Sequence, residues 1–215
     1  MYRMRRIRRH LLLALMSGTL GTVIFLTLSS PDVFFRMSMA SAYTSLSFLG
    51  ASLILGPWNV LRNRPNPVST DLRRDVGIWA GLSGVFHVVV GLQVHMGGKF
   101  WLYFFYPLEE RHFFVFRHDP FGFANYTGLG ATLVLLLLLA LSNDLSLRCL
   151  GTSRWKSLQR WNYPCSILVV LHGIAYQLVE KRMLFVALLI AIVIIPATLQ
   201  FAGYRIQRCQ KAALT

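Results

Sequence analysis

Six long apolar segments, separated by polar and basic stretches, make up most of the chain. An α-helix needs about 20 apolar residues to cross the hydrocarbon core of a bilayer, and each segment is close to that length. The clearest is 125–142, in which the stretch from Ala131 to Leu141 holds one threonine and no charge. The pattern predicts an all-α fold, an integral membrane bundle of six helices. We expect the spans at about 11–30, 38–61, 75–96, 125–142, 160–179 and 183–203.

The composition indicates a membrane protein and excludes a soluble one. Of the 215 residues, 55% are hydrophobic and 14% are charged, whereas soluble domains have about 45–50% and ~25%. Neither a G-x-G-x-x-G motif after a strand nor a G-x-x-x-x-G-K-[ST] motif occurs, so a soluble nucleotide-binding domain is not expected. We expect a basic cytoplasmic tail at 1–10, one six-helix transmembrane domain at 11–205 and a cytoplasmic tail at 206–215.

The charge is strongly basic, with 22 Lys and Arg residues against 8 Asp and Glu residues and a net charge of +14. In a soluble protein this balance would suggest a nucleic-acid partner, but here the basic residues lie between the apolar segments. Sixteen of them flank one side of the predicted bundle and six flank the other. Cytoplasmic loops carry the excess of Lys and Arg. We therefore place both termini in the cytoplasm of a multi-pass protein of the cell (inner) membrane, with lipid and no nucleic acid as partner.

Two of the six histidines, His87 and His172, lie well inside predicted spans. Ionisable side chains inside a membrane are costly and mark functional sites. His87 follows Arg74 by 13 residues and His172 follows Arg160 by 12, and both arginines mark the cytoplasmic start of their spans. At 1.5 Å per residue the two rings lie at similar depths of ~20 and ~18 Å. If the two helices are neighbours, the imidazoles are placed to bind a haem iron from both sides.

Glycines lie on the same helix face as the first of these histidines. Steps of three and four residues place on one face Gly77, Gly81, Gly84, His87 and Gly91. The missing side chains leave room for a flat macrocycle, so we add Gly84 and Gly91 to His87 and His172 as predicted cofactor-binding residues. The alternative is that these glycines serve close packing of membrane helices, as in small-xxx-small contacts.

Two short motifs accompany the histidines: Arg73-Arg74-x-x-Gly77-x-Trp79 precedes His87, and Trp155-x-x-Leu158 precedes His172. Their order and spacing over about 70–205 resemble the ferric reductase-like transmembrane family, and within it the haem-binding subunits of periplasmic methionine sulfoxide reductases. The resemblance implies a six-helix bundle that binds b-type haem, with His87 and His172 as axial ligands of the iron. It also implies a basic residue near the inner surface, Arg73 or Arg74. We expect this residue to contact a haem propionate; the alternative is that it only sets the orientation of the chain in the membrane.

The chain departs from the family pattern near Gln159, where a further histidine of the fifth span is expected and does not occur. We therefore predict one haem b, with the inner gap bridged by FMN, a quinone or a partner protein. The implied function is electron transfer from a cytoplasmic flavin reductase or membrane quinol to an outer-face redox partner, such as a periplasmic reductase. The chain would be the electron-transfer subunit of an oxidoreductase, without catalytic residues of its own.

Two other functions remain open from the sequence. In a proton or metal transporter the two histidines would be relay groups, although all eight acidic residues lie at span ends or in loops and transporters often carry acidic residues within their spans. In a membrane assembly subunit without a cofactor, the histidines would only pack between helices.

Overall fold

The structure, a computed structural model, describes residues 2–64, 72–107, 110 and 112–212. Within these residues the chain is helical, and its β structure is limited to one bridge between Phe105 and Phe116. The elements are α1 (Tyr2–Thr27), α2 (Val33–Leu61), α3 (Leu72–Gly91), the 3-10 helix η1 (Phe100–Tyr103), α4 (Pro120–Leu141), α5 (Asp144–Gln159), α6 (Asn162–Val179) and α7 (Met183–Ala212). The all-α prediction is confirmed.

Five helical segments of the described chain are long and apolar enough to cross a membrane. They are Met4–Thr27, Val33–Leu61, Pro120–Leu141, Asp144–Val179 and Met183–Gln210. Large apolar side chains are exposed along them, including Leu15, Leu133, Leu184 and Ile194, which suits contact with lipid. Length and composition thus support five of the six predicted spans; α3, which carries charged residues in its first turn, is not among the five.

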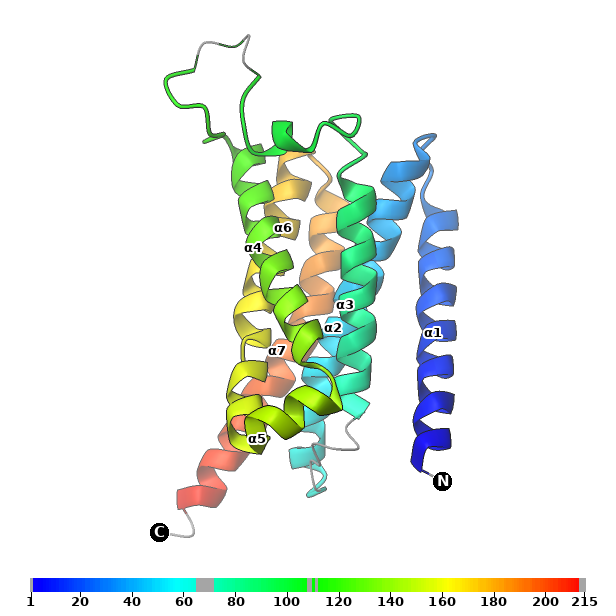
Figure 1. Ribbon diagram of the computed structural model, residues 1–215, viewed down its shortest axis with the longest axis vertical. Coiled ribbons are helices and arrows are strands. Elements are labelled where there is room, and N and C mark those ends of the chain that lie inside the picture. The colour runs from blue at the N-terminus through cyan, green and yellow to red at the C-terminus, as the bar shows by residue number, and fades with distance from the viewer. Residues whose placement is uncertain (1, 65–71, 108–109, 111, 213–215) are drawn as a thin grey trace.

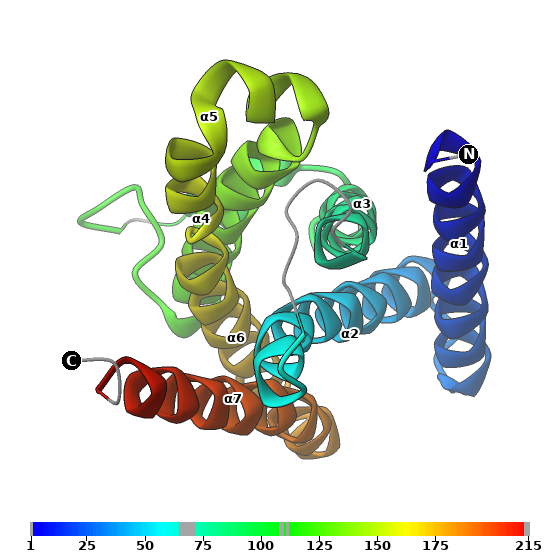
Figure 2. The same cartoon turned by 90° about the horizontal axis from the view of Figure 1, so that it is seen from below.

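Antiparallel helices form the bundle, and both termini lie at the same end of it (Figure 1). We call this the inner end, following the predicted orientation, and the opposite end, which carries the loop between α3 and α4, the outer end. α2 packs against α1, α3 and α7, while α4 packs against α6. Figure 2 shows α1 at the edge of the group, beside α2 and α3, whereas α4, α5 and α6 form the other side.

The element boundaries differ from the predicted ones at both termini and after the fourth span. α1 begins at Tyr2 and α7 runs to Ala212, so the described parts of the two expected tails are helical. Arginine and lysine are good helix formers, which lets a span continue into its basic flank. The stretch 144–159, expected to be a loop, forms α5, which crosses the inner end (Figure 1). Trp155 fixes it there, because the ring is 5% exposed and its Nε1–H donates to the Leu141 carbonyl at 2.8 Å.

Polar side chains of the spans connect the helices to one another. The Ser45 hydroxyl on α2 donates to the Ala80 carbonyl on α3 at 2.8 Å. The Tyr43 hydroxyl donates to the Phe185 carbonyl on α7 at 2.7 Å. Without a hydrophobic driving force between helices in lipid, such hydrogen bonds and close packing hold a membrane bundle together. They fix α2 against α3 and α7, and the walls of the site described below depend on this arrangement.

Two carboxylates, one buried and one exposed, form an ion-pair network between three helices at the inner end. Asp75 on α3 is fully buried, and the Arg9 guanidinium on α1 lies 2.5 Å from one of its oxygens, with Arg6 at 3.5 Å. Arg6 also pairs with Asp144 on α5 at 3.0 Å, and Arg74 pairs with the same carboxylate at 2.8 Å. Because an unpaired buried charge costs several kcal/mol, this network ties α1, α3 and α5 together.

Candidate functional site

A cavity of about 520 Å³ lies between α2, α3, α4 and α6, and the loop after α3 covers its outer end. The predicted residues His87, His172, Gly84 and Gly91 all line it. Five aromatic residues of the loop also line it: Phe100, Trp101, Tyr103, Phe104 and Phe105. The cavity is within the usual range for cofactor sites, and most of its lining is apolar.

The two membrane histidines face each other across this space. Their ring centres are 6.2 Å apart, with the planes inclined at 65°. An imidazole nitrogen binds a transition-metal ion at about 2.0–2.1 Å, so rings on opposite sides of one ion have their centres roughly 6 Å apart. The two rings thus lie close together, as the sequence argument assumed, and their separation suits one metal ion between them.

Each of these rings is held by a backbone carbonyl from a third helix. Nδ1 of His87 lies 3.0 Å from the Ser38 carbonyl on α2, and 3.2 Å from the Ser38 hydroxyl. Nδ1 of His172 lies 2.7 Å from the Ala124 carbonyl on α4. Because a carbonyl only accepts, Nδ1 carries the proton, and Nε2 of each neutral ring keeps its lone pair. Metal-binding histidines show this arrangement, in which the carbonyl fixes the tautomer and raises the basicity of the ligand.

The donor set suits haem better than a bare metal ion. Within the described ranges, no group of three or more His, Cys, Asp or Glu side chains is placed to hold a metal, as a structural zinc site requires. A porphyrin supplies four nitrogens of its own and needs only axial ligands from the protein. Two facing imidazoles in a mostly apolar cavity therefore fit this group.

The glycines of α3 have mixed roles. A Cβ at Gly84 would lie 2.8 Å from Leu135 of α4, and one at Gly81 would lie 2.5 Å from Leu139. These two positions thus serve close packing of α3 against α4, which was the alternative reading of the glycine pattern. A Cβ at Gly91 would lie 3.4 Å from the Ser38 hydroxyl and 3.8 Å from His87, so this glycine adjoins the histidine itself.

A glycine on α4 that the sequence did not single out lies closest to a site residue. A Cβ at Gly128 would stand 2.7 Å from Nδ1 of His172. Real Cβ atoms essentially never come so close to another atom, so only glycine allows the ring to reach the Ala124 carbonyl. A facing glycine on another helix cannot be found by reading along one helix.

The arginines expected to contact a propionate lie away from the site. Among the described residues that line the cavity, neither Arg73 nor Arg74 appears. Arg74 is 6% exposed and is directed toward Asp144 of α5. Arg182, between α6 and α7, is the only Lys or Arg among the described lining residues, and it lies at the outer end. In the sequence, the only indication that Arg182 belongs to the site is its position just after the outer end of the helix that carries His172.

Polar and aromatic side chains continue from the histidines to the outer end. The ring centre of Tyr176 lies 5.5 Å from that of His172 and 5.6 Å from that of His95. His95 follows the end of α3, and the Tyr103 hydroxyl holds this turn by donating to the Gly91 carbonyl and accepting from the His95 amide, each at 3.1 Å. Nε2 of His95 lies 3.7 Å from a Glu180 oxygen, and the residue lines the mouth of the cavity.

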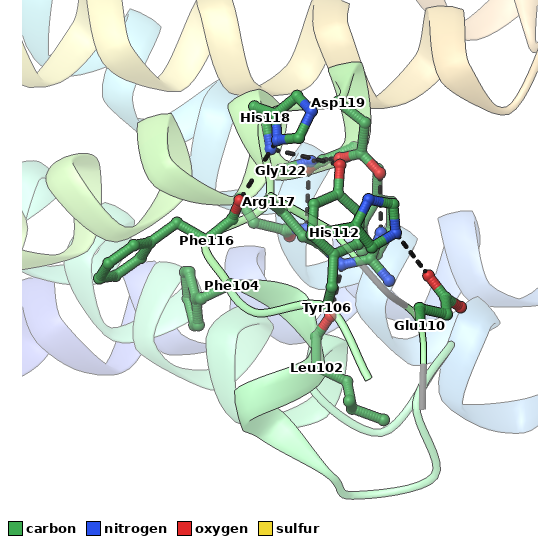
Figure 3. Close-up of polar contacts among 12 residues, drawn as sticks. Leu102, Phe104, Tyr106, Glu110, His112, Phe116, Arg117, His118, Asp119 and Gly122 are labelled. Carbon is green, nitrogen blue, oxygen red and sulfur yellow. Dashed lines mark hydrogen bonds and ion pairs between the residues drawn. The ribbon is translucent and has the colours of Figure 1, made fainter. Parts of the chain in front are cut away.

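The remaining loop histidines belong to a separate cluster on the outer surface (Figure 3). The ring of His112 stacks on Tyr106 at 3.6 Å, and its Nε2 lies 2.9 Å from a Glu110 oxygen. Arg117 fixes the loop by donating to the Leu102 carbonyl at 2.8 Å. Among the described residues that line the cavity, neither His112 nor His118 appears. Gln159, at the end of α5, also lies outside the cavity lining.

No protein-family model, curated protein or solved structure matches this chain. The resemblance to the ferric reductase-like family therefore stays a prediction.

Proposed function

We propose that the chain is a b-type haem protein of the cell (inner) membrane that carries electrons from a cytoplasmic donor to an outer-face acceptor. The observation that carries the proposal is the facing pair His87 and His172. Their ring centres are 6.2 Å apart across a cavity, and each Nδ1 lies on a backbone carbonyl. Haem iron, when bound, supplies a one-electron couple.

The protein residues have three tasks in this proposal. Nε2 of each histidine holds the iron, while the Ser38 and Ala124 carbonyls keep the rings oriented. Apolar lining residues such as Leu135, Val169 and Leu189 exclude water, which tunes the reduction potential. Asp and Glu do not occur among the described lining residues, and in this proposal Nε2 of each facing histidine binds iron and does not serve as an acid or base.

The depth of the histidine pair supports an acceptor at the outer end. His87 lies four residues before the end of α3, and His172 lies seven residues before the end of α6. At 1.5 Å per residue these distances are about 6 and 10 Å, against about 22 and 15 Å to the inner ends. The path from the inner end to the histidines is longer. We propose that a flavin reductase with FMN, or a membrane quinol, supplies the electrons at that end.

An absorption spectrum of the purified protein tests the proposal directly. We expect a low-spin b-type spectrum after dithionite reduction, with one haem per chain. His87→Ala and His172→Ala should each abolish that spectrum. His118→Ala is the matched control, because His118 belongs to the outer-loop cluster, and it should leave the spectrum unchanged.

The opposite results are equally clear. A folded, colourless protein from haem-sufficient cells would reject the proposal and return attention to a transporter or an assembly subunit. Loss of the spectrum in His118→Ala, with retention in His87→Ala, would place the haem elsewhere. Two haems per chain would contradict the single-haem prediction at Gln159.

A further inference from the structure

The outer mouth of the cavity is polar, in contrast to the apolar walls around the histidines. Three polar residues line this end of the cavity. Gln177 lies at the end of α6, Arg182 lies in the turn after α6, and His95 lies in the turn after α3. Two of these residues have polar groups without a partner, and together they form what we call the outer mouth.

Gln177 has an unpaired polar atom in a buried position. The residue is 7% exposed, and its Oε1 has no hydrogen-bond partner. Its Nε2 contacts only a weak acceptor, the Met39 sulfur at 3.5 Å. An amide can be turned about its last torsion, so either the oxygen or the NH₂ group can face the cavity. A buried amide without a partner costs free energy, and a ligand with a hydrogen-bonding group at this position would remove that cost.

Arg182 has donors to spare. Its Nη2 pairs with Glu180 at 3.1 Å, and its guanidinium lies 4.3 Å from the centre of the Phe35 ring. Among the described residues, no hydrogen bond engages Nε or Nη1 of this side chain. A guanidinium has five N–H donors, so Arg182 can keep Glu180 and still bind a second carboxylate.

The distance along α6 between His172 and Gln177 is short enough for one ligand to contact both residues. His172 and Gln177 are five residues apart on this helix, an axial separation of about 7–8 Å. The ring of Tyr176 lies between His172 and His95 of the outer mouth, with its centre 5.5 Å from the first ring and 5.6 Å from the second. A planar group centred between the histidines thus has its edge near the outer mouth.

We propose that the outer mouth binds the propionate carboxylates of the haem, with Arg182 and Gln177 as donors and His95 beside them. This inference rests on the proposed function and replaces Arg73 and Arg74 in the role that the sequence suggested. The haem edge that carries the negative charge then faces the outer end. Arg74 instead neutralises Asp144 at the inner end.

A comparison of haem with haem dimethyl ester, which lacks the carboxylate charges, tests this assignment. Both are added to haem-free protein in detergent, and their transfer to apomyoglobin is timed. Wild type should lose the ester about ten- to hundredfold faster than haem, the range for charge-assisted hydrogen bonds. Arg182→Gln should lose both at similar rates, and Arg182→Lys should restore part of the difference. Lys181→Gln is the control, because exposed Lys181 does not line the cavity; it should behave as wild type.

Three results would decide against the assignment or its basis. If Arg182→Gln keeps the wild-type difference while Arg73→Gln or Arg74→Gln removes it, the carboxylates face inward and the inference is wrong. If the wild type binds no haem, or His87→Ala and His172→Ala bind it normally, the proposed function itself fails. If Arg182→Gln does not assemble, Gln177→Glu replaces it: the added charge should weaken haem binding more than ester binding, and an equal effect on both would overturn the assignment.

Discussion

Gly128→Ala should disturb His172 through a single added methyl group. The new Cβ would stand 2.7 Å from Nδ1 and 2.9 Å from Cε1 of the ring. Ordinary van der Waals contact begins at 3.4 Å, so the ring must retreat by about 0.7 Å. The hydrogen bond from Nδ1 to the Ala124 carbonyl, now 2.7 Å long, lies on the same side and would be stretched or lost.

The expected effects are large enough to measure. A lost hydrogen bond costs about 1 kcal/mol, and a buried carbonyl left without a donor costs more. Changing glycine to alanine within a helix returns about 1 kcal/mol through helix propensity. The free energy of unfolding should therefore change little or fall by about 1 kcal/mol. Haem affinity should fall by about ten- to hundredfold, as it does when the partner of a metal-binding histidine is lost.

Gly130→Ala on the same helix provides the comparison. A Cβ there would meet only Leu168, at an ordinary 3.5 Å, so the variant should gain about 1 kcal/mol from helix propensity and bind haem normally. Thermal unfolding in detergent and haem titration by absorbance measure both quantities. The reasoning is refuted if Gly128→Ala and Gly130→Ala bind haem equally and unfold at the same temperature.

Three further outcomes follow from the contacts of the described residues. Arg9→Gln should lower the unfolding free energy by about 1–3 kcal/mol, because Asp75 loses its nearest cation; thermal unfolding measures this, and adding Asp75→Asn should recover part of the loss. Ser38→Ala should change haem affinity less than threefold, because the His87 ring keeps its bond to the backbone carbonyl; a large loss would show that the hydroxyl holds the ring. Trp155→Phe should weaken the attachment of α5 by about 1 kcal/mol through the lost indole hydrogen bond, seen as faster amide hydrogen exchange in that helix, and unchanged exchange would argue against this anchor.

The depth of the histidines could be predicted from the sequence, whereas their surroundings could not. The fixed rise per residue places His87 and His172 at one level once the basic residues mark the helix starts. Which helix lies opposite which depends on tertiary packing, so Gly128, which faces His172 from α4, carried no signal of its own. The same holds for Arg182, whose direction is set by the turn between α6 and α7.

One predicted boundary differs from the structure, and one predicted glycine role is only part of what the structure shows, both for local physical reasons. α5 has no apolar periodicity strong enough to indicate a helix, and it is held in place by the buried ring of Trp155, a contact with the end of α4. Gly81 and Gly84 share the helix face of His87, and both pack against α4, although Gly84 also lines the cavity. Residues that share a helix face point in the same direction, but the sequence does not show whether a neighbouring helix or a ligand lies on that side.

The buried carboxylate of Asp75 bears on how the chain enters a membrane. Its counter-charges, Arg6 and Arg9, belong to the first helix, which leaves the ribosome before the helix that carries the aspartate. In the proposed membrane orientation, both cations are therefore synthesised before the carboxylate that they neutralise. A shortened chain that began after the first helix would contain the same carboxylate without these two partners. We expect such a chain to be impaired in membrane insertion and assembly before any effect on its chemistry.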